Sequence, residues 1–542
     1  MRRKGWLIII IACVLLGMPA RAQTTVERLL DEMTLEQKVA QMFVMSFYGS
    51  QLNEPAGDLL TAWQPGAVVL LPSNLQDPSQ ITRLTNDIQQ SLIDAGGVPA
   101  FIAVDQEGGI IAHLEDGFTV WPVPSLLTAT QNLELAQQVG QAFASEMLAV
   151  GINMNLAPVA DLQTNPDNPI IGRRAFGNDP QMVAPMVAGF VQGMQAHGVL
   201  ATLKHFPGHG DTDADSHLEL PIITADLDQL WARELQPFRA GIEAGAGAIM
   251  TAHIHFSQID MDAIRPASLS SNVIQGLLRD ELGHQGLVIT DALDMDAIDT
   301  IYSPAQAALN AIIAGNDLIL LGAHISPDNQ AQAMQAVVDS VRTGTLNESR
   351  INQSVRRILQ AKAQYNVLDW HALDALSASD RIDSGTHAIL IDRLFQQGIT
   401  QVHDEGDLFP LTGRTLMIYP AYRGTLGLAC SQGDWQFAAI SLNPDADTIR
   451  AVADSALYAD NVLVFTENMV AHPAQAELVR ALPAERTAVI ALWSPFDALH
   501  MPAIASYWVT YSPLPQAYEP LCDMLHGEIP TQGQLSVNLS RR

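Results

Sequence analysis

Short apolar runs alternate with longer segments of helical periodicity from Thr24 to about Asp369. Eight of these runs have the length and composition of strands: Val39–Phe47, Ala67–Leu71, Phe101–Val104, Ile152–Val159, Val199–His205, Ala248–His253, Leu287–Ala292 and Leu318–Leu321. Most of them are apolar at consecutive positions rather than at every second position, which is typical of parallel strands buried on both faces. The pattern therefore predicts a parallel sheet covered on both sides.

Segments with apolar residues at steps of three and four lie between the runs, for example Leu133–Val150, Pro180–His197 and Leu230–Ala244. We expect these segments to be helices. Eight strand–helix units over roughly 350 residues fit a (β/α)8 barrel, which commonly takes about 250 residues and tolerates insertions. A doubly wound open sheet is the alternative. The predicted barrel covers residues 23–369, with Leu346–Leu368 as its last helix.

Polar residues stand at or just after the carboxyl ends of five consecutive runs: Asp105, Asp161, Lys204 with His205, His253, and Asp291. A barrel builds its site on one face from the ends of several strands. This distribution favours the barrel over the open sheet, and it makes these residues candidates for contact with a substrate.

A second group of strand candidates follows: Thr415–Tyr419, Val462–Phe465, Thr487–Leu492 and Tyr507–Tyr511, with helical Thr448–Leu457 and Pro473–Ala481 between them. We expect a smaller α/β sandwich domain over residues 387–542. The polar, less periodic residues 370–386 predict a linker. No G-x-G-x-x-G motif opens a helix, so no dinucleotide cofactor is expected.

The first 22 residues have the layout of a secretory signal peptide. Arg2, Arg3 and Lys4 precede an apolar run, and an A-x-A cleavage signal ends at Ala22. An uncleaved membrane anchor is the alternative, and it would need about 20 apolar residues. We expect an exported protein (secreted, cell-surface or periplasmic) that is cleaved near Ala22 and has no membrane contact in its mature form.

The formal net charge is −30, and removal of four basic residues with the leader would make it −34. No basic run is present to bind nucleic acid. Of three cysteines, Cys430 and Cys522 would remain in the mature chain. They could form one disulfide in an oxidising compartment or stay as two buried thiols. No Cys/His spacing resembles a zinc site.

The titratable residues are densest in the stretch Lys204-His205-Phe206-Pro207-Gly208-His209-Gly210-Asp211-Thr212-Asp213-Ala214-Asp215-Ser216-His217. Its proline and glycines exclude a helix, so His205 and His209 cannot form a helical metal pair. The stretch does not match a calcium-binding loop, because Ser216 and Ile222 stand where such a loop needs glycine and glutamate. Hydrogen-bonded packing at a barrel rim is one alternative. The other is acid/base chemistry, in which Asp215 orients His217.

Four motifs carry a resemblance to a known family: Lys204-His205-Phe206-Pro207-Gly208-His209-Gly210 with Asp215-Ser216-His217, Val104-Asp105-Gln106-Glu107-Gly108-Gly109, Gly172-Arg173-Arg174-Ala175-Phe176-Gly177, and Val288-Ile289-Thr290-Asp291-Ala292-Leu293-Asp294-Met295. In their order along the chain they resemble the motifs of the β-N-acetylglucosaminidase (β-N-acetylhexosaminidase) branch of glycoside hydrolase family 3. The C-terminal part is similar to the α/β sandwich of two-domain members.

The resemblance implies a nucleophilic Asp291, a general acid/base His217 and Asp215 as its partner, with two displacements and net retention. It also implies substrate-binding residues, and the candidates are Asp105, Arg174, Lys204, His205, Asp161 and His253. No metal or cofactor is expected.

The implied substrate is a glycan with terminal β-linked N-acetylglucosamine, from peptidoglycan fragments or chitin-type oligosaccharides. Phosphorolysis of the same linkage, or β-glucosidase activity within the family, is the nearest alternative. A catalytically silent glycan-binding protein is the alternative from another class, although such a module needs no paired nucleophile and acid.

Overall fold

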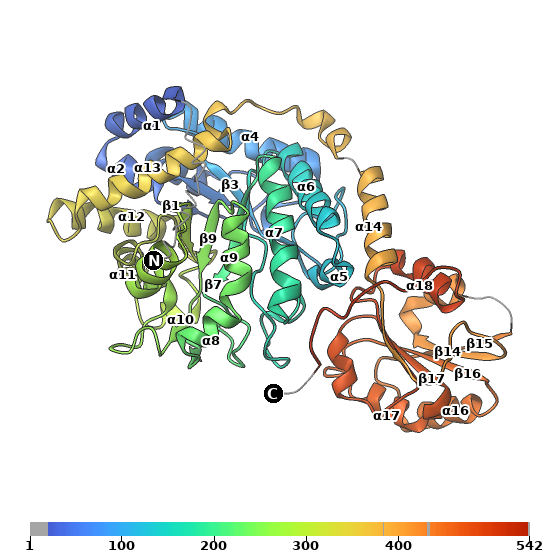
Figure 1. Ribbon diagram of the computed structural model, residues 1–542. Coiled ribbons are helices and arrows are strands. Elements are labelled where there is room, and N and C mark those ends of the chain that lie inside the picture. Colours follow the sequence, from blue (N-terminus) through green and yellow to red (C-terminus); the bar gives the residue numbers. More distant parts are fainter. Residues whose placement is uncertain (1–19, 383, 431–433, 540–542) are drawn as a thin grey trace, which may run out of the picture.

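The computed structural model describes residues 20–382, 384–430 and 434–539. Figure 1 shows a large barrel and a smaller sheet domain beside it. The expected signal peptide lies outside the described residues except for residues 20–22, which begin helix α1 (Ala20–Glu32). No helix among the described residues is long and apolar enough to cross a membrane.

Eight parallel strands form the barrel: β1 (Phe43–Met45), β2 (Ala67–Val69), β3 (Phe101–Val104), β6 (Met154–Asn155), β7 (Leu200–Phe206), β9 (Ala248–Thr251), β11 (Leu287–Thr290) and β12 (Ile319–Leu320). They follow one another around the sheet in chain order, and β1 pairs with β12. A parallel bridge between Ile289 and Leu318 joins β11 to β12. The sheet is therefore a nearly closed barrel, which confirms that prediction over the open sheet.

Helices surround this sheet (Figure 1): α2 (Leu35–Gln41), α3 (Glu54–Trp63), α4 (Pro78–Asp94), α5 (Pro124–Thr130), α6 (Leu133–Ala149), α7 (Pro180–Ala196), α8 (Leu227–Ala232), α9 (Leu235–Glu243), η4 (Asn272–Glu281), α11 (Pro304–Ala314), α12 (Pro327–Arg342) and α13 (Glu348–Gln364). Side-chain caps and prolines determine where several of these helices begin. The Asn132 side chain caps α6, the Asp179 side chain caps α7, and Ser303 caps α11. Proline at the first position of α7 and α11 presets the helical backbone there.

The smaller domain contains a sheet of six strands in the order β13 (Thr400–Asp404), β18 (Ser506–Val509), β17 (Thr487–Ala491), β16 (Asn461–Thr466), β14 (Thr415–Pro420) and β15 (Trp435–Ile440). Only β13 runs antiparallel to its neighbour. Figure 1 shows α16 (Ala446–Ala456) and α17 (Ala474–Ala481) on one side of the sheet and α18 (Tyr518–Leu525) on the other. This is the expected α/β sandwich.

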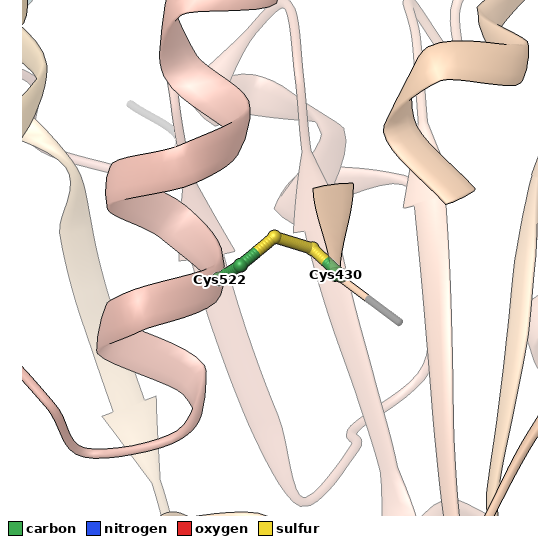
Figure 2. Close-up of a disulfide and its surroundings, with 2 residues drawn as sticks. All are labelled: Cys430 and Cys522. Carbon is green, nitrogen blue, oxygen red and sulfur yellow. A yellow bond between two sulfur atoms is a disulfide. The ribbon is translucent and has the colours of Figure 1, made fainter. Parts of the chain in front are cut away.

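Cys430 and Cys522 form a disulfide (Figure 2). Cys430 directly follows α15 (Gly424–Ala429), and Cys522 lies within α18. Their Cα atoms are 5.0 Å apart, and 92 positions separate them in the sequence. Of the two alternatives left open by the sequence, the structure therefore contains the disulfide.

A linker joins the two domains, and a second stretch of chain returns from the smaller domain to contact the barrel. The expected linker 370–386 contains two short 3-10 turns, η6 (Ala375–Ser377) and η7 (Ser379–Arg381), and the first residues of α14 (Ser384–Gly398). A return segment, residues 534–538, lies against the barrel loops: the Gln534 N–H donates to the Ala129 carbonyl at 2.9 Å. The Asn538 N–H donates to Asn178 Oδ1 at 2.6 Å. The barrel loop that ends at Asn178 thus contacts the second domain.

Candidate active site

A cavity of about 520 Å³ opens at the carboxyl ends of the barrel strands. Most of the residues expected at the site line it: Asp105 after β3, Arg174 on the loop after β6, Lys204 and His205 on β7, His217 on the loop after β7, and Asp291 after β11. Strand ends and their loops position these side chains, as expected for a barrel enzyme. We call this space the active-site cavity.

Two cations and two carboxylates form a cluster on its wall. Lys204 Nζ donates to Asp105 Oδ1 at 2.6 Å and lies 2.7 Å from Glu107 Oε1. Arg174 donates two hydrogen bonds of 2.8 Å to Glu107, from Nε to Oε2 and from Nη2 to Oε1. Glu107 thus fixes both cations, while Asp105 remains partly exposed.

Electrostatics keep this cluster charged. Burial alone would raise the pKa of Glu107, but the charges of Lys204 and Arg174 and their hydrogen bonds outweigh it and lower that pKa to about 2. Burial opposes the charge on Lys204 too, yet Asp105 and Glu107 raise the pKa of the ammonium. The cluster presents fixed N–H donors and a carboxylate acceptor, which suits the hydroxyl and amide groups of a sugar.

Asp291 follows β11 and is held by two hydrogen bonds. Its N–H donates to the Thr251 carbonyl at 3.1 Å, and its Oδ1 accepts from the Ala292 N–H at 2.8 Å. Burial would raise the Asp291 pKa, but nearby donor and cationic groups, among them the Ala292 N–H and the Lys204 ammonium, outweigh it and lower that pKa below its usual value. Asp291 is therefore ionised at neutral pH, as a carboxylate nucleophile must be.

Asp161 lies behind the cavity wall, fully buried, and does not line the cavity. Its Oδ2 is 2.7 Å from His205 Nδ1 and accepts from the His205 N–H, while its Oδ1 accepts from the His209 N–H at 2.7 Å. Burial raises the Asp161 pKa to about 6, and it lowers that of His205 well below its usual value. At neutral pH we therefore assign a neutral His205 that donates from Nδ1 to an ionised Asp161. Arg174 Nη2 then donates to His205 Nε2 at 3.4 Å.

His253 is also buried behind the wall. Its Nδ1 lies 2.7 Å from Ser268 Oγ and its Nε2 lies 2.9 Å from the Ala292 carbonyl oxygen. Burial lowers the His253 pKa, so the neutral ring accepts from the Ser268 hydroxyl and donates to Ala292. Asp161 and His253 were expected to bind substrate, and their positions do not support this. They act on the site by positioning the residues beside it.

The expected dyad is present on the loop after β7. His217 Nδ1 lies 2.9 Å from Asp215 Oδ1, and the His217 N–H donates to the same oxygen at 2.8 Å. The His217 side chain is 56% exposed and lines the active-site cavity together with Asp291. Because Asp215 engages Nδ1, exchange of a proton with a bound ligand would use Nε2.

This loop takes its shape from neighbouring segments. A Cβ at Gly210 would lie 1.6 Å from the Leu162 carbonyl oxygen, so only glycine fits there. Asn168 Nδ2 donates to the His209 carbonyl at 2.9 Å. His209 Nε2 lies 2.8 Å from Ser216 Oγ, one residue before His217. His209 thus anchors the loop and does not form a metal pair with His205. No group of three or more His, Cys, Asp or Glu side chains in the described part of the chain could hold a metal ion.

Glu107 was not among the residues expected at the site. It lies on the short hairpin of β4 (Gln106–Gly108) and β5 (Ile111–Ala112), two residues after Asp105. In the sequence, the one sign of its importance was that it is a second carboxylate in the motif around Asp105. Only the fold shows that Glu107 points toward Lys204 and Arg174, which follow it by 97 and 67 positions in the chain.

The strand ends of this barrel place an ionised carboxylate, a His–Asp pair and fixed cations around one cavity. Such an arrangement is suited to the hydrolysis of glycosidic bonds. Residues 34–361 match the N-terminal domain of glycosyl hydrolase family 3. The chain belongs to this family and is a glycosidase.

Similar proteins agree with this assignment. Beta-hexosaminidase A of Pseudoalteromonas piscicida is 33% identical over 424 residues, which are 71% of this chain and 70% of that protein. A solved glycoside hydrolase family 3 beta-N-acetylglucosaminidase from Paenibacillus sp. str. FPU-7 is 34% identical, with a TM-score of 0.81 over 94% of this chain and 99% of that one. A beta-glucoside phosphorylase with a TM-score of 0.81 is only 24% identical and shows the fold alone.

Proposed function

We propose that the protein is a retaining β-N-acetylglucosaminidase that uses Asp291 as nucleophile and His217 as general acid/base. The observation that carries the proposal is that His217, which Asp215 holds by its Nδ1, and the ionised Asp291 line one cavity. The names of the similar proteins, beta-hexosaminidase and beta-N-acetylglucosaminidase, support the choice of sugar.

In the first displacement Asp291 attacks the anomeric carbon, and the glycosidic bond breaks as a covalent glycosyl-enzyme forms. His217 gives its Nε2 proton to the departing oxygen. Asp215 accepts the hydrogen bond from Nδ1 and stabilises the imidazolium form that donates. The usual second carboxylate of a glycosidase is thus replaced by a histidine with a carboxylate partner.

In the second displacement His217 removes a proton from water, and the water attacks the same carbon. Two inversions give net retention. Meanwhile Lys204, Arg174 and Asp105 hold sugar hydroxyls or the 2-acetamido group from the cavity wall. These contacts accelerate the reaction only if they strengthen in the transition state.

The test compares aryl β-N-acetylglucosaminide with aryl β-glucoside, using the wild type and Asp291→Asn. We expect turnover of the acetamido sugar alone and its loss in the variant. Preference for the glucoside would contradict the proposed sugar. Full activity of Asp291→Asn would contradict the nucleophile, and an inactive wild type would favour a glycan-binding protein.

His217→Ala should lose about 10²- to 10⁴-fold in turnover, because general acid–base catalysis contributes about that much. A substrate with a very good leaving group needs no protonation, so its glycosylation step should be partly retained. Pre-steady-state kinetics with leaving groups of different pKa separates the two steps. His197→Ala, a histidine at the end of α7, is the matched control and should keep its activity. Equal losses with good and poor leaving groups would contradict the acid role.

Phosphorolysis is a second candidate, and a specific feature favours it. A histidine acid/base can be neutral where a carboxylate would repel an anionic acceptor, and Lys204 and Arg174 add positive charge to the cavity wall. Inorganic phosphate in the assay would then give N-acetylglucosamine 1-phosphate in place of the free sugar. Mass spectrometry of the product decides between water and phosphate as acceptor.

We also propose that the protein is exported. The charged and apolar pattern of residues 1–22 supports this, and so does the Cys430–Cys522 bridge, because disulfides persist mainly in oxidising compartments. Sequencing of the mature N-terminus should find Gln23 first. Recovery of the intact leader in cytosolic protein would contradict the proposal.

A further inference from the structure

A short turn of the barrel, η2 (Gly172–Arg174), carries two arginines that line different cavities. Arg174 lines the active-site cavity. Arg173 lines a second cavity, which lies between the barrel loops and the smaller domain. Because consecutive Cα atoms are held about 3.8 Å apart, a displacement of Arg173 also displaces Arg174. The contacts that hold Arg173 therefore bear on the active site.

The barrel anchors the start of this turn. The N–H groups of Ile170 and Ile171 both donate to Asn168 Oδ1, at 2.9 and 2.8 Å. The next backbone hydrogen bond is local, because the Arg174 N–H donates to the Ile171 carbonyl at 2.8 Å. These bonds fix the first half of the turn, and the smaller domain contacts the rest.

Trp493 of the smaller domain holds Arg173. It follows β17 by two residues, at the carboxyl end of that strand. The guanidinium carbon of Arg173 lies 3.4 Å from the centroid of the Trp493 ring, which is a cation–π contact. Arg173 Nε and Nη1 are buried and have no hydrogen-bond acceptor among the described residues. Glu467 also attracts Arg173, but its oxygens accept hydrogen bonds from Arg423 and Tyr422. The ring face is therefore the main short-range partner of this cation.

The smaller domain also holds the chain just after the turn. The Asn178 side chain exchanges two hydrogen bonds with the Asn538 backbone: Nδ2 donates to its carbonyl at 3.1 Å, and Oδ1 accepts from its N–H at 2.6 Å. At Gly177 a Cβ would lie 2.2 Å from the Ser536 carbonyl oxygen, so the two backbones are in direct contact. Arg174 thus lies between two contacts with the smaller domain.

The carboxylate that Arg174 binds is supported in a similar way. Glu107 lies on the β4–β5 hairpin, and Gly109 of this hairpin packs so closely on Val123 that an added Cβ would lie 2.5 Å from Val123 Cγ1. The Val123 N–H donates to Ser512 Oγ of the smaller domain at 2.9 Å. The smaller domain therefore supports both partners of the Arg174–Glu107 ion pair.

We propose that Trp493 is a positioning residue for the reaction in the barrel. By holding Arg173, its ring fixes the turn η2 and with it the Arg174 guanidinium in the active-site cavity. The inference rests on the proposed role of Arg174 in holding the substrate. It goes beyond that role because it gives a residue of the smaller domain a part in substrate binding.

The experiment is a double-mutant cycle between Trp493 and Arg174, with the hydrolysis of aryl β-N-acetylglucosaminide as the readout. Trp493→Leu should lower kcat/KM by about 10- to 100-fold, since a displacement of about 1 Å can cost about 10²-fold. Trp493→Phe keeps an aromatic face over Arg173 and should retain most of the wild-type value. In the Arg174→Gln background, Trp493→Leu should cause no further loss, because the group that it positions is already absent.

The cycle separates a positioning role from a loss of folded protein. A variant that folds poorly would lose the same factor in both backgrounds, and such additive losses would overturn the proposal. Full activity of Trp493→Leu in the wild-type background would overturn it too.

Two further variants locate the effect. Arg173→Met removes the cation from the ring and should reproduce the loss of Trp493→Leu, and the two changes together should lose no more than either alone. A wild-type kcat/KM in Arg173→Met would show that Trp493 does not act through Arg173. Trp435→Leu is the matched control: this half-buried tryptophan of β15, whose ring neighbours are Phe437 and His526, should keep its activity when replaced.

The cycle remains decisive if the proposed function is wrong. If the wild type prefers the aryl β-glucoside, the proposed sugar is wrong, and the same cycle is measured with the glucoside. If it hydrolyses neither substrate, the proposed catalysis is wrong, and calorimetric titration with N-acetylglucosamine gives the four dissociation constants instead. Equal dissociation constants in the wild type and Trp493→Leu would overturn the positioning role, and no binding by the wild type would overturn both proposals.

Discussion

Glu107 shows how a single side chain can organise a charged site. It receives two hydrogen bonds from Arg174 and lies 2.7 Å from the Lys204 ammonium, with almost no exposure of its own. Its negative charge offsets the repulsion between the two cations, both of which it contacts directly. Glu107 therefore positions the N–H donors of Lys204 and Arg174 to which we assign substrate binding.

Glu107→Gln should lower both activity and stability. The neutral amide leaves Lys204 and Arg174 facing each other with less compensation, and breaking a buried ion pair costs about 3–5 kcal/mol. We expect a loss of at least about 10²-fold in kcat/KM, since a displacement of about 1 Å can cost that much. Aryl glycoside kinetics and urea unfolding measure the two effects. Glu134→Gln, exposed in the first turn of α6, should change neither quantity. A fully active Glu107→Gln enzyme would contradict this role.

The residues of the site were easier to predict than their contacts. Asp291, His217, Asp215, Lys204 and Arg174 were recognised by their motifs, and the structure brings them to or beside one cavity. The strand-end pattern could not separate residues on the wall from those one layer behind it. Asp161 and His253 follow strand ends as the others do, but backbone N–H groups and a serine hydroxyl occupy their polar atoms.

At the scale of elements, the loop between β7 and α8 carries the proposed acid/base pair, Asp215 and His217, on residues that belong to neither a helix nor a strand. It keeps its path by lying against the loop after β6, where Gly210 approaches Leu162. Glycine allows this approach because it has no Cβ.

Gly210→Ala should therefore displace the loop and impair catalysis more than folding. The added Cβ would overlap the Leu162 carbonyl, so the backbone must move and take His217 with it. We expect kcat on a poor leaving group to fall by about 10-fold or more, the lower part of the acid–base contribution. Gly276→Ala, where no atom lies within 4 Å of the new Cβ, is the control. Wild-type kcat in Gly210→Ala would show that the loop does not need this contact.

The barrel strands could be predicted because each is buried on both faces and reads as an uninterrupted apolar run. In the first run, Val39–Phe47, only Phe43–Met45 form the strand, because Val39–Gln41 end helix α2. Two strands of the smaller sheet were missed. β13 and β15 lie at its two edges, and most of their residues are partly or fully exposed. A strand that has a neighbour on one side only needs fewer apolar residues, which accounts for the mostly polar sequence of β13 but not for the largely apolar sequence of β15.

At the scale of the whole molecule, the disulfide should stabilise the smaller domain. It closes a loop of about 92 residues, and loss of a native disulfide typically costs about 2–5 kcal/mol. Cys430→Ala/Cys522→Ala should therefore lower the unfolding temperature of this domain, and dithiothreitol should lower that of the wild type similarly. Scanning calorimetry resolves the domains. The same unfolding temperature with and without reductant would contradict a stabilising bridge.

The stability of the barrel should also depend on pH through Lys362. This lysine of α13 is fully buried, and burial lowers its pKa to about 7. The unfolded chain, with a pKa near its usual value, then binds more protons than the folded one between about pH 7 and 10. The free energy of unfolding should rise with pH across this window, relative to Lys362→Met, by about 2 kcal/mol from pH 7 to 9. A difference between the two proteins that does not change with pH would contradict the shifted pKa.

The return segment also bears on the order in which the enzyme becomes active. Residues 534–538 contact the barrel loop at Gly177 and Asn178, a few residues after Arg174. During refolding, a barrel whose neighbour has not yet docked would lack this support. Activity should then return later than barrel secondary structure, so that docking of the domains works as the last step of maturation.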